Sequence, residues 1–317
     1  MSKHTKSHMS KKGLLACICL FMATATFAEK IVLKPNWSKG DSRSYSITNY
    51  TDTARSTSAD MTIEVLDNSN DYLMSCVYSN YQDFTGMEEM AMMVIGKDKY
   101  EKIKAYTPHY TVSKEGKILR IKNFDEYLKI YETSKDSTDD PMKQMGGMLS
   151  SILKSLLAPD EKSFMDINLK EVLAQHKHFG IKYDTKKETK TTTDITISTI
   201  NLKEAKAISK AEVVNDQITI TTTAKLKEKE CVAAINQWIE KYMADVAKEM
   251  GMDINDPDAQ KTIKEMKKEY EKSKVWAEFE ERVTYDKKTG WMISYKSKET
   301  FHSSEGDSSQ SMVINLK

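Results

Sequence analysis

The feature that most constrains the fold is a long helical segment, Glu230 to Lys274, set between two regions of strand pattern. Its first half places apolar residues at steps of three and four, the spacing of one face of an α-helix. These residues are Val232, Ile235, Trp238, Ile239, Tyr242, Met243, Val246 and Met250. Gly251 interrupts the pattern, and Asp256-Pro257 predicts a second helix start. Such a helix needs an apolar surface to cover, and the flanking strands offer one.

Apolar and polar residues alternate on both sides of this segment, which predicts antiparallel strands with one buried face. The alternation is clear at Met61-Thr62-Ile63 and over residues 217–226. Turn residues such as Asn215-Asp216 separate the strands. We therefore predict an α+β fold in which a curved antiparallel sheet carries amphipathic helices on one face.

Shorter helices are predicted over residues 124–131, 141–157 and 164–176, the first capped by Asn123. Strands, helices and strands thus follow one another twice along the chain. Residues 29–317 are predicted to form a single α+β domain. Two similar halves, 29–180 and 181–317, are an alternative that rests on this order alone, because no residue-level repeat accompanies it.

The first 28 residues have the pattern of a signal peptide. Lysines precede an apolar run from Leu14 to Met22, and small residues at Ala23-Thr24-Ala25 and Thr26-Phe27-Ala28 provide cleavage signals. The run is too short to span a membrane, and nothing later approaches the roughly 20 apolar residues required. We expect cleavage after Ala28 and export to the periplasm or beyond, with no transmembrane segment.

A lipid anchor is the competing interpretation of the same region. Leu14-Leu15-Ala16-Cys17 resembles the bacterial lipobox, in which the cysteine is lipidated. Only four residues separate Lys12 from Cys17, and apolar residues follow the cysteine where a tether is usually polar. These observations favour signal peptidase cleavage over an anchor at Cys17.

After cleavage two cysteines remain, Cys76 in a strand pattern and Cys231 at a helix start. In an oxidising compartment they could form one long-range disulfide. Each position equally suits a small buried apolar residue, so both alternatives stay open.

Charge is dense but balanced, with 48 basic and 47 acidic residues and a formal net charge of +1. A nucleic-acid-binding domain is expected to carry a net basic charge. The composition therefore argues against a nucleic-acid partner.

Two methionine clusters have M-x-x-M spacing: Met87, Met90, Met92 and Met93, and Met142, Met145 and Met148. Thioethers bind Cu(I), but methionine more generally forms adaptable apolar surfaces. We favour the second interpretation. The predicted apolar ligand or partner surface comprises Met142, Met145, Met148, Trp238, Tyr242 and Met243.

Other motifs are weaker. Ser151-Ile152-Leu153-Lys154 and Lys288-Thr289-Gly290 match two motifs of the serine β-lactamases, but the third motif is missing and the second lies in a predicted hairpin turn. His176-Lys177-His178 could seed a metal site, although a solvated helix end is the interpretation we prefer. No catalytic, cofactor-binding or metal residue is assigned, and no cofactor is expected.

The order of leader, meander, methionine-rich helices, second meander and final Asp-x-x-Thr-Gly hairpin resembles uncharacterised exported bacterial envelope proteins. At fold level it is similar to the half-barrel superfamily of lipoprotein carriers, which implies helices closing a half-barrel-like sheet over an apolar cavity. The leading hypothesis is a non-enzymatic envelope protein that binds a lipid, another apolar ligand or an envelope protein partner. The alternatives are an interaction module with a filled core and a hydrolase with an unrecognised site.

Overall fold

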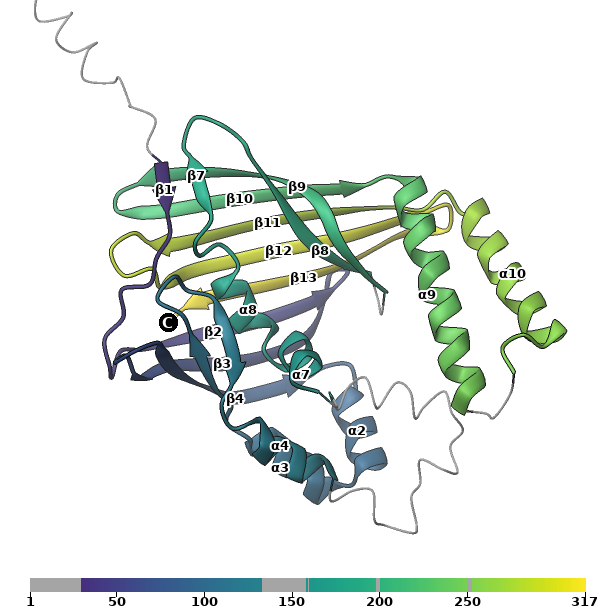
Figure 1. The fold of residues 1–317 in the computed structure, drawn as a ribbon, viewed down its shortest axis with the longest axis horizontal. Helices are drawn as coiled ribbons and strands as arrows, with labels where there is room; N and C mark the ends of the chain where they lie inside the picture. The colour runs from purple at the N-terminus through teal and green to yellow at the C-terminus, as the bar shows by residue number, and fades with distance from the viewer. Residues whose placement is uncertain (1–29, 133–157, 159, 198–199, 250–252) are drawn as a thin grey trace, which may run out of the picture.

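The computed structural model describes residues 30–132, 158, 160–197, 200–249 and 253–317, and the statements below concern these residues. They form a mixed α+β structure built on a large antiparallel sheet that is not closed (Figure 1). A separate two-stranded ribbon pairs β1 (Lys30–Val32) with β7 (Lys182–Asp184). The predicted fold class is confirmed, whereas the predicted half-barrel curvature stays a prediction.

The large sheet has eleven strands in the order β6-β5-β4-β3-β2-β13-β12-β11-β10-β9-β8, and all neighbours are antiparallel. The last strand therefore lies beside the first strand of this sheet, which joins the two halves of the chain. The strands are β2 (Ser42–Thr51), β3 (Ala54–Asp67), β4 (Tyr72–Asp83), β5 (His109–Val112), β6 (Ile118–Ile121), β8 (Thr189–Ile197), β9 (Ile200–Val214), β10 (Gln217–Leu226), β11 (Trp276–Asp286), β12 (Met292–Ser303) and β13 (Gly306–Leu316).

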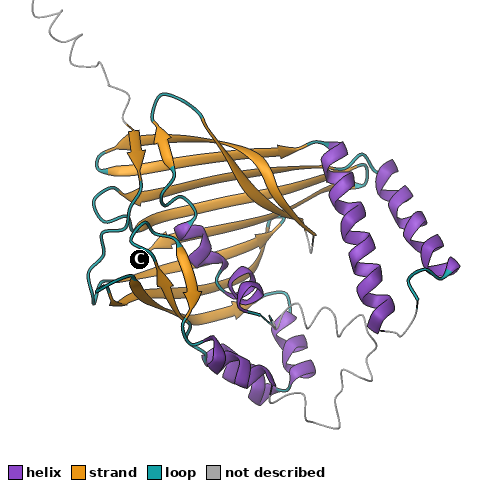
Figure 2. Ribbon diagram, in the orientation of Figure 1, coloured by secondary structure: helices purple, strands orange, loops and turns teal. Residues whose placement is uncertain are grey.

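Seven helices lie within the described ranges (Figure 2). They are α2 (Met87–Ile95), α3 (Lys97–Ala105), α4 (Phe124–Glu132), α7 (Glu161–Asn168), α8 (Lys170–His176), α9 (Glu228–Glu249) and α10 (Pro257–Lys272). The predicted restart is confirmed, because the Asp256 side chain accepts a hydrogen bond from the backbone of Asp258 and Pro257 is the first residue of α10. The predicted helix over residues 141–157 lies outside the described residues.

Tight turns set the register of two hairpins. Asn215 and Asp216 both have positive φ, 50° and 61°, as a two-residue hairpin turn requires. In the other turn the carboxylate of Asp286 accepts hydrogen bonds from the backbone of Lys288 and Thr289 and from the Thr289 hydroxyl. Gly290 closes it with a φ of 76°, and a Cβ there would lie 2.7 Å from the carbonyl oxygen of Lys34.

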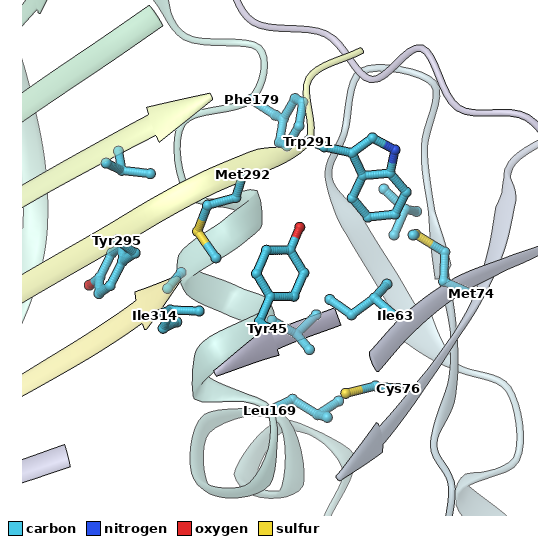
Figure 3. Close-up of a cluster of buried hydrophobic side chains, with 14 of the residues drawn as sticks. Tyr45, Ile63, Met74, Cys76, Leu169, Phe179, Trp291, Met292, Tyr295 and Ile314 are labelled. Carbon is cyan, nitrogen blue, oxygen red and sulfur yellow. The ribbon is translucent and has the colours of Figure 1, made fainter. Parts of the chain in front are cut away.

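The first of two apolar clusters fills the space between the sheet and α8, the short helix in front of the strands in Figure 1. Tyr45 stands between Met292 and Ile63, and Leu169, just before α8, lies near Cys76 (Figure 3). Trp37 and Trp291 stack at 4.8 Å between ring centroids above this layer. These side chains are buried, so the described part of this cluster is a filled core.

The second cluster lies under α9, at the far end of the strands (Figure 1). Cys231, Ile235 and Ile239 of the helix are buried against strand residues that include Ala207, Ala224 and Ala277. Alanine allows a close helix approach to the sheet at these positions. Helix α9 thus covers one end of the sheet, whereas α8 lies over its centre (Figure 1).

Cys76 belongs to the first cluster and Cys231 to the second. Both are buried free thiols, so the disulfide alternative is not the one this structure adopts. Burial raises the pKa of the Cys231 thiol to about 11, which keeps it protonated at neutral pH.

Candidate functional site

A row of polar residues crosses the helix-bearing face of the sheet and separates the two apolar clusters. Each residue in the row is the direct cross-strand partner of the next, from β9 to β3. The row consists of Ser209, Thr222, Glu281, Ser297, Met312, Asn49 and Thr57, and Met312 is its single apolar member. We call it the polar row.

The neighbouring rows on the same face are apolar where the two clusters lie. On the α8 side the register aligns Ala211, Ile220, Val283, Tyr295, Ile314 and Ile47, all in the first cluster. On the α9 side it aligns Ala207, Ala224 and Phe279, all in the second cluster. The two helices therefore pack on opposite sides of the polar row.

Glu281 lies near the middle of the polar row and is 2% exposed. Its carboxylate accepts hydrogen bonds from His178 Nε2 at 2.6 Å, Lys177 Nζ at 2.8 Å and the Tyr295 hydroxyl at 3.0 Å. Burial alone would raise the pKa of Glu281, but the hydrogen bonds and charges of His178 and Lys177 outweigh it and lower the pKa to about 2. The carboxylate is thus ionised and has its hydrogen bonds satisfied.

His178 links Glu281 to the β1–β7 ribbon. Its Nδ1 lies 2.6 Å from the hydroxyl of Tyr183 on β7, while Nε2 donates to the carboxylate. A hydroxyl, an imidazole and a carboxylate in a chain resemble the groups of a hydrolase triad. Burial raises the pKa of Tyr183, whose side chain is 1% exposed, so its hydroxyl is a protonated interior group. The arrangement therefore holds the ribbon and the end of α8 to the sheet.

The preferred interpretation of His176-Lys177-His178 as a solvated helix end is wrong. His176 and His178 are both buried, because the chain leaves α8 directly into the interior. His176 Nδ1 lies 2.9 Å from the carbonyl oxygen of Gly116, and burial lowers the pKa of His176 to about 4. Within the described ranges no group of three or more His, Cys, Asp or Glu residues could hold a metal ion.

Of the predicted apolar surface, Trp238 and Tyr242 lie together. Their rings stack at 5.1 Å between centroids with an interplanar angle of 10°, and both side chains are half-buried. Trp238 and Met243 both pack on the second cluster, and Met243, also half-buried, lies about 100° further around the helix than Tyr242. Met142, Met145 and Met148 lie outside the described residues.

The position of α10 shows which way the Trp238–Tyr242 stack faces. Lys267 of α10 forms an ion pair with Glu240 of α9, so α10 packs along the side of α9 that carries Glu240. Helical geometry places Trp238 and Tyr242 roughly 160° away from Glu240. The stack therefore points away from the side of α9 on which α10 packs.

Burial along the polar row falls from its β9 end to its β3 end. Ser209, Thr222, Glu281 and Ser297 are buried, whereas Met312, Asn49 and Thr57 are half-buried. Phe301, on the same face of β12 as Ser297, is half-buried against the second cluster. This half-buried part of the face, with the Trp238–Tyr242 stack, is the candidate functional site.

A second apolar surface lies on α2. Met87, Met90 and Met93 are 42%, 43% and 74% exposed, and Phe84 just before the helix is 52% exposed. Exposed methionines at helical spacing agree with an adaptable apolar surface. The Cu(I) alternative for these residues stays untested.

The β-lactamase-like motifs do not form a described site. Ser151 and Lys154 lie outside the described residues. Lys288-Thr289-Gly290 occupies the hairpin turn expected for it, where the Thr289 hydroxyl donates to Asp286. That hydroxyl therefore stabilises the turn.

Comparison of the chain with models of protein families and with curated proteins finds no match. No helix in the described ranges combines the length and apolarity needed to cross a bilayer.

Proposed function

We propose that this chain is an exported, non-enzymatic envelope protein that binds an apolar ligand between α9 and the sheet. The observation that carries the proposal is the stacked, half-buried pair Trp238 and Tyr242, which faces away from α10. Aromatic rings offer large apolar contact areas and are typical of ligand pockets.

Two further features support this placement. The core beside α8 is filled by side chains, which leaves the half-buried face near Phe301 as the better place for a ligand. The signal-peptide pattern of residues 1–28 agrees with a protein that meets lipids in the envelope. A lipid acyl chain is the apolar ligand that such a compartment supplies in quantity.

Native mass spectrometry of the protein purified from its envelope, followed by lipid extraction, tests the proposal. We expect an added mass that organic extraction identifies as a lipid. We also expect Trp238→Ala to reduce its occupancy at least about tenfold, because truncating a buried aromatic anchor commonly costs 2 kcal/mol or more in binding.

The matched control is Trp276→Ala. Trp276 is a half-buried tryptophan on β11 that stacks on His302 at 3.6 Å between centroids. This variant should keep the ligand. Wild-type protein that carries no lipid, or equal loss in both variants, would contradict the proposal.

A second candidate function is that of an interaction module that binds a protein partner through α2. The exposed row of Met87, Met90 and Met93 favours it, because soluble monomers seldom expose contiguous apolar patches without a use. A photo-crosslinking amino acid at position 93, with position 208 on the outer face of β9 as control, tests it. A discrete adduct from position 93 alone supports this function, and identical patterns from both positions oppose it.

A further inference from the structure

The polar row places hydrogen-bonding groups on the proposed ligand surface. A purely apolar ligand would leave these groups without partners. Ser297, Asn49 and Thr57 put hydroxyl and amide groups on the same face as Phe301. Ser297 lies four positions before Phe301 on β12, so the polar row and Phe301 are about 13 Å apart along the strand. Hydrogen-bonding and apolar groups therefore lie within the length of one amphiphile.

Asn49 and Thr57 are joined by a hydrogen bond, and each side chain keeps an atom that can form a further one. The Asn49 side-chain nitrogen donates to the Thr57 hydroxyl at 2.9 Å. In the described part of the chain the side-chain oxygen of Asn49 accepts no hydrogen bond, and the Thr57 hydroxyl still carries its own proton. The pair can thus both accept from and donate to a ligand.

Charge at the centre of the row disfavours an anionic group. Glu281 carries a negative charge, and the nearest cation, Lys177, has its Nζ bonded to Glu281 and Thr193 and placed 4.5 Å from the ring centroid of Phe279. An anion here would face that carboxylate beside a cation that is already paired. Uncharged hydroxyl or amide groups have no such penalty.

We propose that the ligand is an amphiphile with an uncharged, hydroxyl- or amide-bearing head group on Asn49 and Thr57, and an apolar chain on Phe301, Trp238 and Tyr242. This inference rests on the proposed function, because it assigns the chain of the ligand to the same aromatic surface.

Isothermal titration with two twelve-carbon amphiphiles below their micellar concentrations tests it: dodecyl maltoside, with an uncharged sugar head, and sodium dodecanoate. We expect dodecyl maltoside to bind at least about tenfold more tightly, a ratio that two head-group hydrogen bonds can supply. Thr57→Val, a change of similar shape, should weaken dodecyl maltoside about fivefold and leave dodecanoate unchanged. Thr221→Val, at a half-buried threonine on the opposite face of the sheet, is the control and should change neither.

The outcomes separate the two proposals. The head-group assignment would be overturned by equal affinities for the two amphiphiles, by tighter binding of dodecanoate, or by equal effects of Thr57→Val and Thr221→Val. Each of these outcomes would leave an apolar ligand in place. Binding of neither amphiphile would overturn both. Because Trp238→Ala should weaken both amphiphiles alike, a loss confined to one of them would also overturn the assignment.

Discussion

The imidazole of His178 and the carboxylate of Glu281 lie 2.6 Å apart in the interior, although 103 residues separate them in the sequence. His178 follows α8, and Glu281 is in the middle of β11. Their contact, with Lys177 and Tyr295, joins the end of the central helix to the polar row. We therefore expect these four residues to contribute strongly to the free energy of unfolding.

Replacing Glu281 by glutamine should destabilise the protein by about 3 kcal/mol, because it leaves Lys177 without its buried counter-charge and removes the carboxylate that His178 hydrogen-bonds. Urea unfolding followed by circular dichroism measures the change. Glu278→Gln is the matched control on the same strand, where the carboxylate is 39% exposed and paired with Lys225. That surface ion pair should contribute less than about 1 kcal/mol to the free energy of unfolding. Equal effects of the two substitutions would contradict a supporting role for Glu281.

His176 should make stability depend on pH in mildly acidic solution. Burial lowers its pKa from 6.5 to about 4 in the folded state, so the unfolded chain takes up the proton first as the pH falls. The contribution of neutral His176 to the free energy of unfolding is fully present above pH 6.5 and is lost as the pH falls through 4. In all it amounts to about 3 kcal/mol. Unfolding midpoints measured between pH 7 and pH 4 should fall with pH. The fall should be shallower in His176→Gln, and a slope equal to that of the wild-type protein would contradict this assignment.

Two buried tyrosines should respond differently to loss of the hydroxyl. The Tyr285 hydroxyl donates to the backbone carbonyl of Gln175 at 3.1 Å, whereas the Tyr45 hydroxyl is buried without a hydrogen-bond partner among the described residues. Tyr285→Phe should cost about 1 to 2 kcal/mol because it leaves that carbonyl unpaired, and Tyr45→Phe should be neutral or slightly stabilising. Chemical denaturation of both variants tests this, and a larger cost for Tyr45→Phe would be inconsistent with the hydrogen bonds described.

Gly290 should tolerate a methyl group less well than Gly40. Both have positive φ, 76° and 87°, but a Cβ on Gly290 would meet the Lys34 carbonyl whereas one on Gly40 would have no atom within 4 Å. Both alanine variants carry a backbone cost of about 1 kcal/mol. Gly290→Ala should lose at least about 1 kcal/mol more through this contact. Thermal unfolding of the pair measures the difference, which should vanish if residues 34 and 290 do not approach each other.

Local patterns predicted the local structure well. Period-two alternation marked the strands, and Asp256-Pro257 marked the start of α10, because both signals depend on neighbours in sequence. The pairing of β13 with β2 was not predicted, since it joins segments that lie about 260 to 270 residues apart in the sequence. The backbone hydrogen bonds that join them do not depend on residue type.

The site was predicted only in part. The apolar stripe of α9 indicated Trp238 and Tyr242, but nothing local indicated the polar row, which exists only after the strands are aligned. The burial of α8 was missed because Glu171, Gln175 and His176 suggest a solvated helix, whereas each is buried against the sheet. Glu281 also had no local signal in the sequence, because its partners Lys177, His178 and Tyr295 lie on other elements.

Hydrogen–deuterium exchange with and without dodecyl maltoside tests the central claim most directly, namely that the ligand surface lies between α9 and the sheet. We expect slower exchange on binding in α9 and in β12 and β2, which carry Phe301 and Asn49, with α2 unchanged, and no such protection in Trp238→Ala. Protection confined to α2, or no protection at saturating amphiphile, would contradict it.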